Sequence, residues 1–377
     1  MFYKNISLPS FCTSNDDVIL SIINFCKKNN LPVLIESTSN QVNQFGGYSK
    51  LKPSNFKKKV EKLAKKISFP KKNIIFGGDH LGPLPWKNLD YKIAMDRGEK
   101  LVSLYFKSKF KKLHIDTTMK LKNDKVFNKQ IIKARSEKIL SNLNHKYSNK
   151  LIFILGSEVP PAGGERIIRN FNKKKIFEIK SEILLYKKIF QNLNLKNKLY
   201  LVVDTGMSFN DTKVFKSKTN ILNYLKKISD LMNVKYEAHS TDYQNLKELK
   251  KLAKCNFKFL KVGPELTFNY TKAILKMGKI EKRYFKNHSD IKKVILKVLK
   301  QNKKHWIDYY NLCSMDRVLT GRFDRLRYYW NELNLKKAKN KLLKNIDSLE
   351  KKIILKHINK KVLLKIIYVY LLVLIAV

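Results

Sequence analysis

The sequence predicts an α/β protein built on a closed (β/α)8 (TIM) barrel with a C-terminal helical extension. Short apolar segments recur about every 40 residues, with longer lysine-rich helical patterns between them, which is the rhythm of a parallel barrel. Eight such segments are complete by Val262. A doubly wound sheet is the alternative, but no G-x-G-x-x-G pattern follows an early strand. We place the barrel domain at residues 1–285 and the helical extension at residues 286–377.

Each element follows from its hydrophobic pattern. Continuous apolar runs such as Leu151–Leu155 are typical of strands buried on both faces. Val60, Leu63 and Ala64 repeat at helical spacing and predict a helix over residues 60–67. The expected strands lie at residues 7–12, 31–36, 73–78, 113–116, 151–155, 199–204, 235–239 and 257–262. The other expected helices lie at residues 94–106, 129–143, 175–193 and 214–232.

Composition and charge narrow the function classes. The chain has 377 residues, of which 44% are hydrophobic, so it can bury a large core. Its formal net charge is +49, and the lysines are spread along the whole sequence while arginine is scarce. No nucleic-acid-binding motif is visible, so we expect a solvated lysine surface that attracts anions such as sugar phosphates. Sequence-nonspecific polyanion binding remains an alternative that rests on charge alone.

The cysteines and the terminal segments indicate the cellular compartment in which we expect the protein. Cys12, Cys26, Cys255 and Cys313 form no C-x-x-C pair, which indicates free thiols in a reducing compartment. The first residues lack a signal-peptide pattern, so we expect a cytoplasmic protein. The apolar run at residues 366–377 is shorter than the roughly 20 residues that span a bilayer. We interpret it as a docked helix or an altered end and expect no membrane partner.

Polar residues follow separate expected strands. His80 follows the third, Glu158 the fifth and His239 the seventh, and the carboxyl ends of barrel strands meet at one mouth. Two imidazoles and a carboxylate form a common catalytic zinc set that leaves a position for substrate, so the predicted cofactor is one divalent ion, zinc. Asp79 would orient a ligand or act as a base. A lone histidine is more often structural, and we expect His114, inside a strand, to pack or hydrogen-bond.

A phosphate site is expected at the same mouth. Ser240, Thr241 and Gly263 follow the last two strands, where barrels often bind phosphate through backbone N–H groups. Arg325 and Arg327 could supply a second, bidentate site. The alternative is that these arginines form surface ion pairs.

Several long motifs carry a resemblance to a known family. They lie at residues 35–48, 77–83, 156–160, 236–244, 260–264 and 324–330. In these motifs the chain resembles the GatZ/KbaZ accessory subunits of class II D-tagatose-1,6-bisphosphate aldolase. The resemblance implies a barrel of class II aldolase type and an oligomeric accessory subunit in carbohydrate catabolism. Such subunits support the activity and stability of a separate catalytic subunit.

One stretch departs from both groups of proteins, and the aldolase metal set is incomplete unless Glu158 replaces the missing histidine, which favours an accessory role or a modified chemistry. Class II aldolases carry a metal-binding histidine after strand six, where this chain reads Asp204-Thr205-Gly206-Met207-Ser208. The accessory family usually has Gln-Pro-Gly there, so a role for Asp204 is not implied either. The first hypothesis is an accessory subunit, and the second is a metal-dependent ketose-phosphate aldolase or 4-epimerase. A kinase label, used for some relatives, finds no support because the sequence has no G-x-x-x-x-G-K-[ST] loop.

Overall fold

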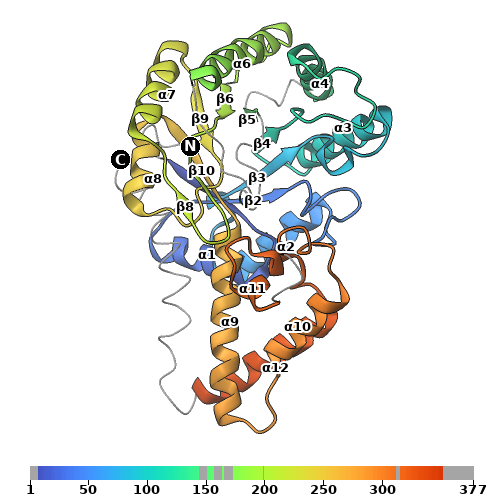
Figure 1. Cartoon of the computed structure of the whole chain (residues 1–377), viewed down its shortest axis with the longest axis vertical. Helices are drawn as coiled ribbons and strands as arrows, with labels where there is room; N and C mark the ends of the chain where they lie inside the picture. The colour runs from blue at the N-terminus through green and yellow to red at the C-terminus, as the bar shows by residue number, and fades with distance from the viewer. Residues whose placement is uncertain are drawn as a thin grey trace.

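Eight parallel strands close into a barrel in the computed structural model, which confirms the predicted fold class (Figure 1). The structure describes residues 7–143, 151–156, 164, 173–197, 199–310 and 315–350. Around the barrel the strands follow the order β1-β10-β9-β6-β5-β4-β3-β2. Their bounds are β1 Leu8–Cys12, β2 Val33–Thr38, β3 Ile74–Leu81, β4 Lys112–Ile115, β5 Ile152–Leu155, β6 Leu199–Val202, β9 Lys235–Ala238 and β10 Phe257–Val262.

Helices surround the barrel wall. Their apolar faces repeat at helical spacing, as in α1, where Val18, Ile19, Ile22 and Ile23 are buried. The helices are α1 Asp16–Lys28, α2 Pro53–Lys66, α3 Tyr91–Lys107, α4 Lys129–Ser141, α6 Lys173–Asn192, α7 Thr219–Met232, α8 Leu246–Lys254 and α9 Pro264–Tyr284. The described part of the chain also contains the single-turn helices η1 Lys71–Asn73, η2 Leu84–Trp86 and η3 Arg325–Tyr328.

Several element boundaries differ from the sequence predictions; α2, for example, begins at Pro53 rather than at residue 60. Two more differences lie at the start of α7 and at the end of β3. The helix expected over residues 214–232 begins only at Thr219, because β8 (Val214–Phe215) pairs antiparallel with β7 (Ser208–Phe209) in a short hairpin. β3 continues to Leu81, so the Asp79-His80 pair lies in the strand rather than in the loop after it. The longer β3 brings both side chains inside the mouth.

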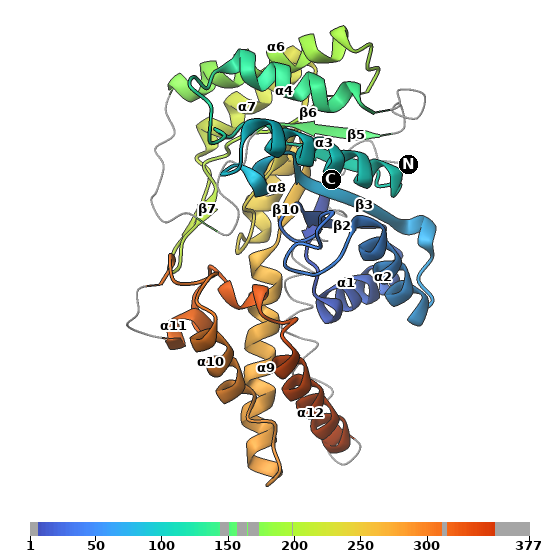
Figure 2. The ribbon, with the colours of Figure 1, turned by 90° about the vertical axis from the view of Figure 1, so that its right-hand side faces the viewer.

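The C-terminal helices extend away from the barrel as an arm (Figure 2). Its centre is α9, which starts at the end of β10 and packs further along against α10 (Ile291–Gln301) and α12 (Leu333–Glu350). The short α11 (Met315–Thr320) and η3 lie between them in sequence and also contact α9. The division at residue 285 stays a prediction, since α9 belongs to the barrel and to the arm.

Two features that the sequence singled out fall beyond the residues with a described structure. The apolar run at residues 366–377 and Cys313 lie outside the described residues. Within the part that is described, no helix is long and apolar enough to cross a membrane. Cys12, Cys26 and Cys255 are buried free thiols.

Candidate metal centre

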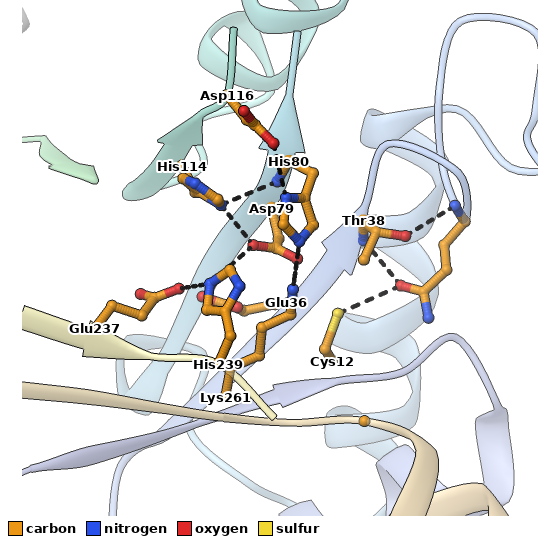
Figure 3. A network of polar contacts seen from close by, with 12 residues as sticks. Cys12, Glu36, Thr38, Asp79, His80, His114, Asp116, Glu237, His239 and Lys261 are labelled. Carbon is orange, nitrogen blue, oxygen red and sulfur yellow. Dashed lines mark hydrogen bonds and ion pairs between the residues drawn. The ribbon is translucent and has the colours of Figure 1, made fainter. Parts of the chain in front are cut away.

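Four buried side chains that can bind a metal gather at the carboxyl ends of the barrel strands. Asp79 and His80 come from β3, His114 from β4, and His239 follows β9. One ligand atom from each lies within 4.8 Å of the others. Figure 3 shows the three rings and the carboxylate turned toward one another. The ring centroids of His80 and His239, paired in the sequence prediction, are 5.1 Å apart.

The Gly77-Gly78 pair lets β3 hold this cluster. A Cβ on Gly77 would lie 2.5 Å from Glu36 Oε1, so only glycine leaves room for that buried carboxylate. Past Gly78 the register of β3 against β4 shifts, and His80 adopts a left-handed φ of 49°. Such irregularities redirect side chains and occur often beside active sites. The strand therefore presents two successive side chains, Asp79 and His80, to the same cluster.

The Asp79 carboxylate joins the members of the cluster. Its Oδ1 lies 2.8 Å from His114 Nδ1, and its Oδ2 pairs with the Lys261 ammonium. Burial alone would raise the pKa of Asp79, but His80 and Lys261 outweigh that effect and hold the pKa well below its usual value. Asp79 is therefore a charged carboxylate in the barrel interior.

His80 is fixed as one tautomer. Its Nε2 lies 2.8 Å from Lys261 Nζ, and its Nδ1 lies 3.2 Å from Asp116 Oδ2. An ammonium only donates, so Nε2 accepts and Nδ1 carries the proton that Asp116 accepts. A carboxylate that holds the far nitrogen of a histidine in this way is the usual arrangement behind a metal ligand.

His114 places a lone pair against Asp79. Its Nε2 lies 3.2 Å from the carbonyl oxygen of Gly156, which can only accept, so Nε2 carries a proton. In the uncharged ring Nδ1 is then a lone pair, 2.8 Å from Asp79 Oδ1. The His80 backbone N–H also donates to this nitrogen, at 3.3 Å. The lone pairs of Nδ1 and Asp79 Oδ1 still repel at 2.8 Å unless a proton or a cation lies beside them. His114 therefore makes hydrogen bonds, as the sequence analysis expected. It is also a candidate metal ligand, a role that its position inside a strand did not suggest.

His239 completes the cluster as a neutral ring. Its Nε2 donates to Glu237 Oε1 at 2.9 Å, while its buried Nδ1 has no hydrogen-bond partner among the described residues. Burial and the charge of Lys261 lower the pKa of His239 to about 3. Burial would raise the pKa of Glu237, but Lys112 lowers it to about 2, so the acceptor is charged. An orphaned buried ring nitrogen on a residue of this cluster fits a divalent metal ion.

The fourth sequence-predicted centre residue, Glu158, lies outside the described residues. Lys261 is the residue that sequence reasoning missed most clearly. A strand alternates its faces, so Lys261 lies on the same face as Phe257 and Phe259. The Phe259 ring lies under the Lys112 ammonium in the barrel interior, so this face points inward. Lys261 therefore points inward at the end of β10.

The predicted phosphate residues divide into two groups. Ser240, Gly263 and Arg327 line the cavity above the cluster together with His80, His239 and Lys261. The Gly263 N–H already donates to Asp242 Oδ1 at 2.9 Å, as does the Glu265 N–H at the start of α9.

Thr241 and Arg325 lie elsewhere. Thr241 is buried and its hydroxyl donates to the carbonyl of Lys261 at 2.7 Å. The Arg325 guanidinium lies 3.8 Å from the centroid of the Tyr309 ring, and its Nε donates to the carbonyl of His305 at 2.6 Å. Arg327 donates from Nη1 to two carbonyls and from Nη2 to Tyr328.

Comparisons with known proteins agree with this architecture. A family model described as D-tagatose-1,6-bisphosphate aldolase subunit GatZ/KbaZ-like matches residues 3–363. The subunit GatZ of Escherichia coli O6:H1 is 30% identical over 365 residues, 92% of this chain and 86% of that protein. Klebsiella pneumoniae GatZ is 30% identical over 358 residues, 91% of this chain and 85% of that protein.

One solved structure is similar over most of its length. It is a Sinorhizobium meliloti 1021 protein described as a probable tagatose 6 phosphate kinase, with a TM-score of 0.81 and 28% identity. The match covers 90% of this chain and 87% of that one.

Proposed function

Because the chain belongs to the GatZ/KbaZ-like family of D-tagatose-1,6-bisphosphate aldolase subunits, we propose that it is the accessory subunit of such an aldolase. In this role it supports the activity and stability of a catalytic class II subunit through direct association, in the cytoplasm. The observation that carries the proposal is the match to named aldolase subunits over 92% of this chain. The expected oligomer is then the assembly of accessory and catalytic subunits.

The metal centre favours a second candidate function, a metal-dependent ketose-phosphate aldolase or 4-epimerase. His80, His114 and His239 would hold a divalent ion, zinc by its preference for imidazole and carboxylate ligands. Such an ion supplies Lewis acidity toward a carbonyl or hydroxyl oxygen. Asp79, charged and within the cluster, is the group able to orient a ligand or accept a proton. Glu158 remains a predicted ligand.

A sugar-phosphate ligand would meet the cavity above this centre. Arg327 and Ser240 line it, so we keep them as the proposed phosphate contacts. Gly263 would contribute only if Asp242 released its N–H, because that bond is already made. Thr241 supports the cavity wall by holding the backbone of Lys261, whereas the Arg325 contacts with Tyr309 and His305 lie outside the cavity lining.

One experiment separates the two functions. The purified chain is assayed for metal content and then for turnover of tagatose and fructose phosphates, with and without a catalytic class II subunit. The accessory role predicts no turnover by the chain alone and increased bisphosphate cleavage in the mixture. Turnover by the chain alone, lost after metal removal, would instead establish the second function.

A further inference from the structure

We propose that the Lys261 ammonium is a built-in cation of the mouth, so that a divalent ion occupies the Asp79–His80 side only after Lys261 withdraws. The proposal goes beyond the accessory role and rests on the ligand set inferred above. It concerns a residue at the end of β10 that contacts two candidate ligands at once.

Contacts place the ammonium on the ligand atoms themselves. Lys261 Nζ lies 2.8 Å from His80 Nε2 and pairs with Asp79 Oδ2. His80 Nδ1 is already committed to Asp116, at 3.2 Å. Nε2 is therefore the nitrogen of His80 that remains to bind a metal.

The lone pair of His80 Nε2 makes the two occupants exclusive. An imidazole nitrogen has one in-plane lone pair, which can accept a hydrogen bond from an ammonium or bind a metal ion. It cannot do both. A divalent ion next to an ammonium would also add strong repulsion between like charges in a buried site. Metal binding to His80 and Asp79 thus requires that Lys261 leave both.

Lys261 has room to withdraw. Its side chain is 10% exposed, and it lines the cavity above the cluster with Ser240 and Arg327. The four-carbon stem of lysine is flexible, so the ammonium can move into the cavity without moving β10. The cavity wall also includes the Asp242 carboxyl group, an acidic neighbour for a displaced ammonium.

Metal-free stability follows from the same contacts. Without Lys261 the buried carboxylate of Asp79 would lose its ammonium partner, and an unpaired charge is costly in a protein interior. The ammonium supplies the missing positive charge. An accessory subunit can therefore keep the barrel mouth folded without a metal ion, and the candidate metal ligands keep their positions.

The test uses the full chain without a catalytic subunit, so its outcome does not depend on the accessory assay. Zinc affinity is measured by competition with a chromophoric chelator for wild type, Lys261→Met and Lys261→Arg. We expect Lys261→Met to bind zinc more tightly by about tenfold to a hundredfold, the range typical of residues next to a metal ligand. Lys261→Arg retains the charge and should stay close to wild type. Lys258→Met, the same change three residues earlier on β10, is the matched control and should leave affinity unchanged.

Thermal unfolding keeps the proposal testable if the variant is unstable. Lys261→Met should melt below wild type without zinc and gain more from added zinc than wild type does, because the ion replaces the lost charge. Zinc affinity of Lys261→Met equal to or weaker than wild type would overturn the proposal. So would a zinc-induced rise in melting temperature no larger than that of wild type.

Discussion

Two lysines in the barrel interior make similar contacts in different surroundings. Lys112 of β4 lies between Glu36 and Glu237, 2.5 Å and 2.6 Å from their carboxylate oxygens, and its side chain is 0% exposed. Lys261 lies between Asp79 and His80 at the mouth and lines a cavity. The first ammonium is sealed below the cluster, and the second can be reached from outside.

The difference in solvent access separates a lysine that supports the site from a lysine that a ligand can replace. Lys112 fixes Glu237, and Glu237 in turn accepts from His239 Nε2, so the sealed lysine holds a ring of the metal centre in place. Lys261 contacts candidate ligands directly, where a ligand can replace it. Lys112 and Lys261 thus carry the same charge but differ in role. Lys112 is structural inside the barrel, whereas Lys261 lies at the mouth, where another cation can replace it.

The largest effect expected from this comparison is on stability. Lys112→Met leaves Glu36 and Glu237 buried without their cation, which should lower the free energy of unfolding by about 3–5 kcal/mol. Lys261→Met should cost less, about 1–3 kcal/mol, because water can reach the mouth. Denaturant unfolding of both variants measures the difference. A Lys112→Met variant no less stable than Lys261→Met would contradict the structural role of the sealed lysine.

The next largest effects are expected on zinc binding. His80→Ala removes a direct ligand and should leave the protein, dialysed against zinc, with little bound metal. Asp116→Asn keeps His80 as a ligand but weakens the hydrogen-bond acceptor that fixes the tautomer of His80. It should reduce zinc affinity by about tenfold to a hundredfold. Elemental analysis and chelator competition give both values. Wild-type occupancy in His80→Ala would place the metal elsewhere.

A smaller effect is expected for phosphate. Arg327→Ala should weaken binding of a ketohexose phosphate by about 1.5–3 kcal/mol, the usual contribution of a hydrogen bond to a charged group. Arg325→Ala is the matched control, since its guanidinium lies against Tyr309 and not in the cavity. Calorimetric titration of each variant measures the difference. Equal losses in the two variants would argue that both arginines act only through packing.

Much of the fold could be predicted from sequence, for physical reasons. Strands buried on both faces are continuous apolar runs, and helices show a 3.6-residue period, so all eight barrel strands could be located. The β7–β8 hairpin could not, because two-residue strands leave no period to detect.

The site was only partly predictable. His80 and His239 stood out because each was expected at the carboxyl end of a strand, and the structure brings them together. His114 and Lys261 lie within strands, where a polar residue suggests a single buried bond. Their convergence depends on register and on the irregularity after Gly78, which no local pattern encodes.

The central claim is that this chain acts as an accessory subunit whose support does not depend on its own metal centre. The direct test is bisphosphate cleavage by a catalytic class II subunit, titrated with wild type or with the double variant His80→Ala, His239→Ala. We predict the same saturating increase in activity with both proteins, after the variant is shown to be folded. An increase with wild type that is absent with the folded double variant, or no increase with either, would contradict the account.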